Sequence, residues 1–215
     1  MPVKFVCLAN SFKLHGRCVA GIVLDNKNKP VINNLGPKWI RPISASEHGE
    51  IPTHHVSHIK LLDIVEINDV TNVGKGHQSE NVLYNENSIQ IVGAYPKSEL
   101  KDLCENERPN IFGNRGKAVA EDAIYRLHHS LMMIESNKHE FIRVPSERNP
   151  DKLQTRLRFF YKNQQYDLAI TDPVFLENYE KDPEAFSNAN DIFVTLSLAI
   201  NLNDWYHKLV AGIIY

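Results

Sequence analysis

Short β-branched or aromatic segments dominate the first half of the chain, and Gly, Pro, Asn or Asp bound each of them. Such segments are typical of β-strands, because branched and aromatic side chains pack well on a pleated surface. The pattern predicts a turn-rich loop at 25–37 and a short helix at 98–106 that Ser98 caps. We predict strands at 3–10, 17–24, 38–43, 62–67, 81–84 and 89–95.

The second half repeats this pattern, and a short polar turn at 162–165 indicates a hairpin. Asp172 followed by Pro173 predicts a helix at 173–180, since the aspartate caps free N–H groups and proline at the first position has none to satisfy. Further strands are predicted at 131–136, 140–145, 153–161, 166–171, 192–200 and 205–214. The fold class is therefore expected to be mostly β.

One amphipathic helix is predicted between the halves, within 116–131. Its apolar residues recur at i, i+4, i+7 and i+11, which places them on one helical face: Ala120, Ile124, Leu127 and Leu131. Two β-barrels of five or six strands are the natural packing for so many short strands, and OB-folds have that size. We expect two small OB-like β-barrels joined by a helical linker, with domains at 1–107 and 131–215 and the linker at 108–130.

Composition fits a folded protein of 215 residues, because hydrophobic residues at 42% and charged residues at 23% are close to globular averages. No apolar run is long enough for a membrane span, and the N-terminus lacks the features of a signal peptide. The three cysteines are an odd number at unrelated spacings, which favours reduced thiols. We therefore expect a cytoplasmic protein with no membrane partner.

The net charge of −2 conceals separate charged blocks. Residues 1–41 carry seven basic residues against one acid (+6), and 138–162 carry seven against three (+4). Residues 42–107 and 163–204 each sum to −7, with four basic against eleven acidic and one against eight. Nucleic-acid binding depends on where charge lies, so near-neutrality does not exclude a nucleic-acid partner.

The segment 153–161 has the clearest alternation in the chain. One face is apolar, and the other is basic with an interleaved aromatic ring: Gln154, Arg156, Arg158, Phe160 and Lys162. That composition is typical of a β-barrel face that binds nucleic acid. The alternative is a half-exposed strand whose charges only solubilise its outer face.

Trp39 and Arg41 share a face of another predicted strand. The pair suits a base stacked on the indole and a phosphate held by the guanidinium. A core tryptophan with an arginine reaching the rim is the alternative.

Two loops carry further polar candidates. The turn between the first two strands holds Asn10, Ser11, Lys13 and Arg17, which suit a phosphate or a base edge, although an ordinary solvated turn explains them too. The Gly-flanked segment 74–81 lacks the phosphate-loop spacing. It is interpreted as a flexible loop whose side chains contact a base or nucleotide: Lys75, His77, Gln78 and Asn81.

A histidine cluster at His54, His55 and His58 offers imidazoles to a transition metal, but no cysteine, nor a glutamate at metalloprotease spacing, accompanies it. A polar loop is the favoured interpretation. No combination of residues indicates catalysis or a cofactor.

These motifs resemble the bacterial dual OB-fold domain (DuOB) proteins over nearly the whole chain. The resemblance rests on LANSxKxxGRCVAG (8–21), WIRPIS (39–44), HQSEN (77–81), YDLAITDP (166–173) and YHKLVAGII (206–214). It implies two OB-like barrels and a nucleic-acid-related role in prokaryotic phage-defence systems. It also implies a set of motif positions: Asn10, Ser11, Arg17, Trp39, Arg41, His77, Gln78, Glu80, Asn81, Asp172 and Lys208.

We therefore expect a non-enzymatic protein that binds single-stranded DNA or RNA, or a nucleotide, through basic aromatic strand faces. Lys208 joins the predicted contacts because the resemblance includes it. One alternative is a sensor or adaptor module that binds a small nucleotide or an operon-encoded protein partner. A second is a metal-dependent nuclease that uses the histidines.

Overall fold

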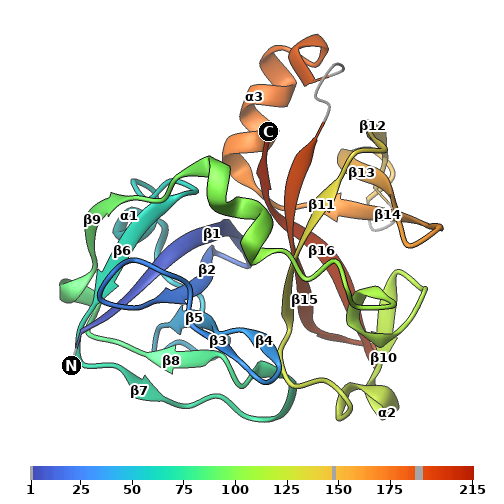
Figure 1. The fold of residues 1–215 in the computed structure, drawn as a ribbon. Helices are drawn as coiled ribbons and strands as arrows, with labels where there is room; N and C mark the ends of the chain where they lie inside the picture. The colour runs from blue at the N-terminus through green and yellow to red at the C-terminus, as the bar shows by residue number, and fades with distance from the viewer. Residues whose placement is uncertain (1, 147–148, 187–190) are drawn as a thin grey trace. The chain divides into compact units, whose positions relative to one another are not determined.

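The computed structural model describes residues 2–146, 149–186 and 191–215 and is mostly β (Figure 1). The chain divides into two compact units. Unit 1 comprises Met1–Glu105 and Leu127–Ser130, and unit 2 comprises Asn106–Arg126 and Leu131–Tyr215. The chain therefore passes from one unit to the other three times.

Unit 1 is built on a seven-stranded sheet in the order β7-β8-β5-β2-β1-β6-β9. The core lies among apolar side chains that are fully buried, such as Phe5, Val19 and Val65. In chain order the strands are β1 (Val3–Lys13), β2 (Gly16–Leu24), β5 (Trp39–Ile43), β6 (Asp63–Ile67), β7 (Thr71–Asn72), β8 (Asn81–Leu83) and β9 (Gln90–Ala94). Each of the six strands predicted in the first half is confirmed.

The connections of unit 1 are short. The loop predicted at 25–37 contains two paired strands of two residues each, β3 (Ile32–Asn33) and β4 (Gly36–Pro37). One-turn helix α1 spans Thr53–Val56. Turns of 3₁₀ helix lie at Gly76–Gln78, Glu86–Ser88 and Lys97–Leu103. The last replaces the predicted helix at 98–106, and Pro96 rather than Ser98 stands at its N-cap.

Unit 2 has a sheet in the order β11-β15-β16-β14-β13-β12, and β10 also pairs with β16. Its strands are β10 (Ala118–Ala120), β11 (Leu131–Ser136), β12 (His139–Pro145), β13 (Leu153–Tyr161), β14 (Gln164–Ile170), β15 (Ile192–Leu202) and β16 (Trp205–Ile214). The predicted hairpin between β13 and β14 is confirmed, and positive φ angles at Lys162 and Asn163 close its turn.

The helices of unit 2 are α2 (Glu121–Ile124) and α3 (Pro173–Lys181), with 3₁₀ turns at Ile111–Gly113 and Glu184–Phe186. Asp172 caps α3 as predicted, because its carboxylate accepts hydrogen bonds from the N–H groups of Val174 and Phe175. Its other oxygen accepts from the N–H of Ile213 on β16. The motif position Asp172 is therefore a buried structural residue.

Two predictions about the architecture are wrong. The helix predicted at 116–131 is replaced by β10 and the four-residue α2, since Val119 pairs with Tyr206 in the sheet. Within the residues described, the strand ladders end at β7 and β9 in unit 1 and at β11 and β12 in unit 2, so neither sheet closes into the expected barrel. None of the helices in the described segments is long and apolar enough to cross a membrane.

Candidate functional site

A pocket of unit 2 forms where one edge of β16 changes its partner strand. Ala118 of β10 pairs antiparallel with His207, whereas Ala169 of β14 pairs parallel with Leu209. The N–H of Lys208, between those two pairs, donates to the carbonyl of Lys117 at 2.9 Å. The residues that enter β10 therefore meet the β13–β14 hairpin beside this point.

The basic pocket, as we call this site, has a volume of ≈ 290 Å³. Three cations and one carboxylate line it, together with an amide and a phenol: Arg115, Lys117, Arg156, Asp167, Gln165 and Tyr166. Three positive charges against one negative charge leave a net charge of +2 on the lining. Such a lining attracts anions.

Asp167 fixes the inner part of the basic pocket. The Nη2 of Arg156 donates to the Asp167 carbonyl at 2.6 Å, its Nε pairs with the Asp167 carboxylate, and Arg158 Nε donates to the same carboxylate at 3.1 Å. Burial by itself would raise the pKa of Asp167, but the hydrogen bonds and charges of the two arginines lower that pKa overall. The carboxylate thus holds Arg156 in place and neutralises part of the positive charge of Arg156.

Arg115 and Lys117 supply the outer charge of the basic pocket. Both residues are exposed and lie in the irregular segment 114–117. In this segment Asn114 Oδ1 accepts a hydrogen bond from the N–H of Gly116. The Arg115 guanidinium makes no hydrogen bond or ion pair with any residue the structure describes. Its donors are available to a ligand, whereas those of Arg156 are largely used within the protein.

The β13 face follows the predicted alternation. Leu157, Phe159 and Tyr161 are buried, whereas Phe160 is 49% exposed. The basic residues of the other face are, however, partly neutralised, because Arg158 pairs with Asp167 and lies 3.8 Å from Glu140. Lys162 is exposed in the hairpin turn. The face is less positive than the strand sequence predicts, since the acids come from neighbouring strands.

Lys208 lies behind the basic pocket and is only 2% exposed. Its Nζ donates to the Asn114 carbonyl at 3.0 Å and to Asn114 Oδ1 at 2.7 Å, and it lies 5.2 Å from the centroid of the Tyr166 ring. Burial lowers the pKa of Lys208 to about 7. The prediction that Lys208 contacts a ligand directly is wrong, because the amine is turned into the protein.

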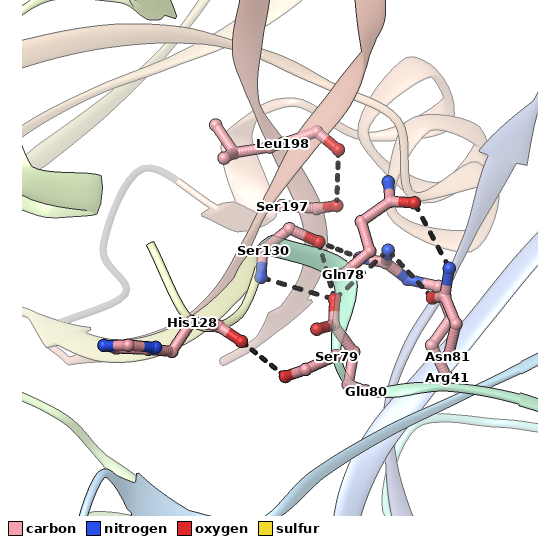
Figure 2. Close-up of polar contacts among 9 residues, drawn as sticks. All are labelled: Arg41, Gln78, Ser79, Glu80, Asn81, His128, Ser130, Ser197 and Leu198. Carbon is pink, nitrogen blue, oxygen red and sulfur yellow. Dashed lines mark hydrogen bonds and ion pairs between the residues drawn. The ribbon is translucent and has the colours of Figure 1, made fainter. Parts of the chain in front are cut away.

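In unit 1, Trp39 and Arg41 share a strand face as predicted, but both side chains are buried. Figure 2 shows the polar contacts of Arg41. Trp39 Nε1 donates to Glu105 Oε1 at 3.0 Å. Arg41 Nη1 lies 3.2 Å from Glu80 Oε1, and Arg41 Nη2 donates to Ser130 Oγ at 2.9 Å. The predicted exposed stacking platform is therefore wrong. Trp39 lies in the core as the alternative has it, but Arg41 is buried as well and does not reach the rim.

Ser130 completes this buried group by donating from Oγ to Glu80 Oε1 at 2.6 Å. We call Arg41, Glu80 and Ser130 the buried triad. Two neighbouring contacts hold the same segments together, because Ser79 donates to the His128 carbonyl and His129 lies 3.5 Å from Glu105. The segment 127–130 is thus anchored to unit 1 by side chains far away in the sequence.

The segment 74–81, predicted as a flexible loop, contributes side chains to this anchoring. Asn81 Oδ1 accepts from Arg41 Nη1 at 3.4 Å, and Asn81 Nδ2 donates to Gln78 Oε1 at 3.2 Å. Burial lowers the pKa of His77, and Arg41 adds to this effect while Glu80 opposes it. Lys75 is exposed, whereas Gln78 and Asn81 are half-buried.

The residues of the first hairpin that we predicted to contact a ligand differ in how deeply they are buried. Asn10 and Ser11 are buried, and Asn10 Nδ2 donates to the carbonyls of Val56 and Ile59 at 2.8 and 2.9 Å. The prediction that these two residues face a ligand is wrong, because both are buried, and Asn10 supports the segment around α1. Lys13 is half-buried, which lowers its pKa, and the Arg17 guanidinium lies 4.7 Å from the ring centroid of exposed Phe12.

The predicted histidine cluster lies in and just after α1, which contains His54 and His55 and ends before His58. The rings of His54 and His55 lie edge to face at 4.2 Å, and His55 Nδ1 is 3.5 Å from Glu86. In the part of the chain that the structure describes, no three His, Cys, Asp or Glu side chains are placed to hold a metal ion.

The whole-chain sequence match decides the family. A family model described as the Dual OB-containing domain matches residues 3–213. The chain belongs to this family. A search of curated proteins found no match to this Dual OB-containing protein.

Solved structures similar to the Dual OB-containing protein share little sequence with it. The Ifi202 HINa domain in complex with 20bp dsDNA is 9% identical with a TM-score of 0.36, and the match covers 98% of this chain and 90% of that one. A murine DNA binding protein bound with dsDNA is 7% identical with a TM-score of 0.35, covering 98% and 96%. Likeness at this level assigns no ligand to this chain.

Sequence reasoning missed Arg115 and Lys117, which lie in the segment interpreted as a linker. The available signal was two cations among the glycines and asparagine of GNRGK (113–117). It also missed Asn114, whose two oxygens hold Lys208.

Proposed function

We propose that this Dual OB-containing protein is a binding protein for nucleic acid, without catalytic activity, and that the basic pocket of unit 2 holds a backbone phosphate. The observation that carries the proposal is the net charge of +2 on the lining, with the donors of Arg115 directed to no other described residue. Arginine suits phosphate because its planar guanidinium donates two parallel hydrogen bonds.

The neighbouring strand face supports single-stranded nucleic acid as the preferred form. Phe160 of β13 pairs directly with Gln165 of β14, which lines the basic pocket. Because paired residues of an antiparallel ladder project on the same side, an exposed ring lies next to a phosphate site. Unpaired bases stack on such rings, whereas bases within a duplex are already stacked.

Fluorescence anisotropy with labelled single-stranded DNA and RNA tests this function. The wild type is expected to bind at low salt, with affinity falling as salt rises. The substitution Arg115→Glu should weaken binding and reduce the slope of log affinity against log salt by about 0.7, the value for one phosphate contact on a single strand.

Lys152→Glu is the matched control, since it makes the same charge change at another exposed position of unit 2. It should leave the salt slope unchanged. Equal losses in both variants would mean that only overall charge matters and would overturn the assignment of the basic pocket. A wild-type protein that binds no oligonucleotide at low salt would overturn the function itself.

A further inference from the structure

Trp205 is a large aromatic side chain left open to solvent at the start of β16. It is 48% exposed, in contrast to Trp39, which is 5% exposed. Its neighbours explain the exposure. Trp205 pairs with Leu202 of β15 on one side and with Ala120 of β10 on the other. A methyl group is too small to cover an indole, so the ring remains open.

The apolar surface extends along the same face of the β15–β16 hairpin. Leu202 is 40% exposed, and Ile200, two residues earlier on β15, is 41% exposed. Leu202 pairs directly with Trp205, so these two side chains project on the same side and form one apolar stripe, whereas the ladder is irregular between Leu198 and Asn201 and does not fix the side on which Ile200 projects. An exposed apolar stripe on a monomer commonly marks a binding surface.

Strand β10 connects Trp205 to the basic pocket. Lys117 lines the basic pocket and directly precedes β10, whereas Ala120 at its other end lies opposite Trp205. Three residues of strand span about 10 Å. Lys117 and Ala120 are three residues apart and so project from opposite sides of the strand, but Gln165 and Asp167 of the basic pocket share the side of Trp205, because Ala169 of β14 pairs with Leu209 of β16. A phosphate in the basic pocket and a base on Trp205 would thus lie within reach of the same short stretch of polynucleotide.

The charges beside Trp205 favour a base rather than a phosphate at the indole. The N–H of Glu121 donates to the carbonyl of Asp204 at 2.9 Å, which brings two acidic residues to the hairpin turn. Carboxylates repel phosphate, so the polynucleotide backbone is favoured at the end of β10 next to Lys117, away from Asp204 and Glu121. The neutral face of a base meets no such repulsion.

We propose that Trp205 is the stacking platform for an unpaired base of a nucleic-acid strand whose phosphate occupies the basic pocket. This inference rests on the proposed function and adds to it a second stacking residue, on β16. The polynucleotide runs between the basic pocket and Trp205, and Leu202 extends the apolar surface beneath the base. Because the base must be free to stack, the site selects single strands over duplexes.

The test measures anisotropy of a labelled oligothymidylate and of a duplex of the same length with wild type, Trp205→Ala, Trp205→Phe and the control Leu153→Ala. Leu153 is an exposed apolar residue of unit 2 outside the stripe. Trp205→Ala should weaken single-strand binding about 5- to 150-fold, the range for loss of one stacked base. Trp205→Phe should restore most of the affinity, and duplex binding should be unchanged by either substitution.

Tryptophan fluorescence gives an independent readout, since the chain has two tryptophans and Trp39 is buried. Oligothymidylate should quench wild-type emission but not that of Trp205→Phe. If the wild type binds single strands and Trp205→Ala binds them as tightly, this inference fails while the proposed function stands. If Trp205→Ala instead abolishes concentration-dependent self-association and leaves oligonucleotide affinity intact, the stripe is a protein interface and the inference is likewise overturned. Absence of all oligonucleotide binding would defeat the proposed function.

Discussion

Arg41 in unit 1 and Lys208 in unit 2 are both almost fully buried cations, but the surroundings of the two differ. Arg41 lies 3.2 Å from the carboxylate of Glu80, which is itself buried. Lys208 has only the two neutral oxygens of Asn114 and the ring of Tyr166, and no described carboxylate pairs with it. Buried Arg41 therefore has a counter-ion, whereas buried Lys208 has none among the described residues.

The chemistry of the two side chains explains this difference. A guanidinium stays protonated in proteins, so burying it requires a negative charge nearby. An amine can instead release its proton, and burial lowers the pKa of Lys208 to about 7. Both residues lie in segments on which the family resemblance was based, so the comparison teaches that a cation in such a segment can stabilise the fold rather than touch a ligand.

The largest expected effect comes from breaking the pair in unit 1. Glu80→Ala removes the carboxylate from Arg41 and should lower the free energy of unfolding by about 3–5 kcal/mol. Urea denaturation measures this loss. Glu99→Ala is the matched control, because its ion pair with Lys29 is exposed and should contribute about 0–1 kcal/mol. Similar losses in both variants would show that burial does not distinguish the two pairs.

A smaller effect is expected from pH in unit 2. Between pH 7 and the ordinary lysine pKa of 10.5, the unfolded chain holds the Lys208 proton and the folded chain does not. The free energy of unfolding should therefore rise with pH in this window, by about 1.4 kcal/mol per unit from this one group. Denaturation at pH 7.5 and 9 should show this rise in the wild type and a smaller one in Lys208→Met. Equal slopes would mean that Lys208 stays charged in the folded protein.

The smallest change makes unit 2 resemble unit 1. Asn114→Asp places a carboxylate beside the Lys208 amine and should raise the pKa of Lys208 by about one unit or more. NMR titration of the Lys208 side chain measures this pKa directly. Asn137→Asp, in an exposed turn of unit 2, should leave it unchanged. A pKa that stays near 7 in Asn114→Asp would show that burial outweighs a neighbouring negative charge.

The strands were predictable because their signals are local. Alternation along 153–161 correctly separated buried Leu157, Phe159 and Tyr161 from exposed Phe160, although Leu153 of the predicted apolar face is exposed. Asp172-Pro173 correctly marked the start of α3. The helix predicted at 116–131 was wrong because its apolar periodicity is a local signal, which does not include the distant strand that pairs with this segment. Residues 118–120 join β16, whose sequence lies more than eighty residues later. Pairing over such distances overrides weak helix propensity.

The site was less predictable than the fold. Alternation placed Trp39 and Arg41 on one face but could not show that Glu105, Glu80 and Ser130 cover that face. Similarly, Asp167 neutralises part of the β13 face from the next strand. The exposed cations Arg115 and Lys117 come from an irregular segment, where no periodic pattern tells the direction of a side chain.

The segment 127–130 limits how the protein can be divided. Because Ser130 of the buried triad follows twenty-one residues of unit 2, no single cut in the chain separates two complete units. A gene fragment that ends at residue 105 or 126 would encode Arg41 and Glu80 without Ser130. The two OB-like units must therefore be inherited together. Recombination of the kind that exchanges ordinary tandem domains would separate Ser130 from Arg41 and Glu80.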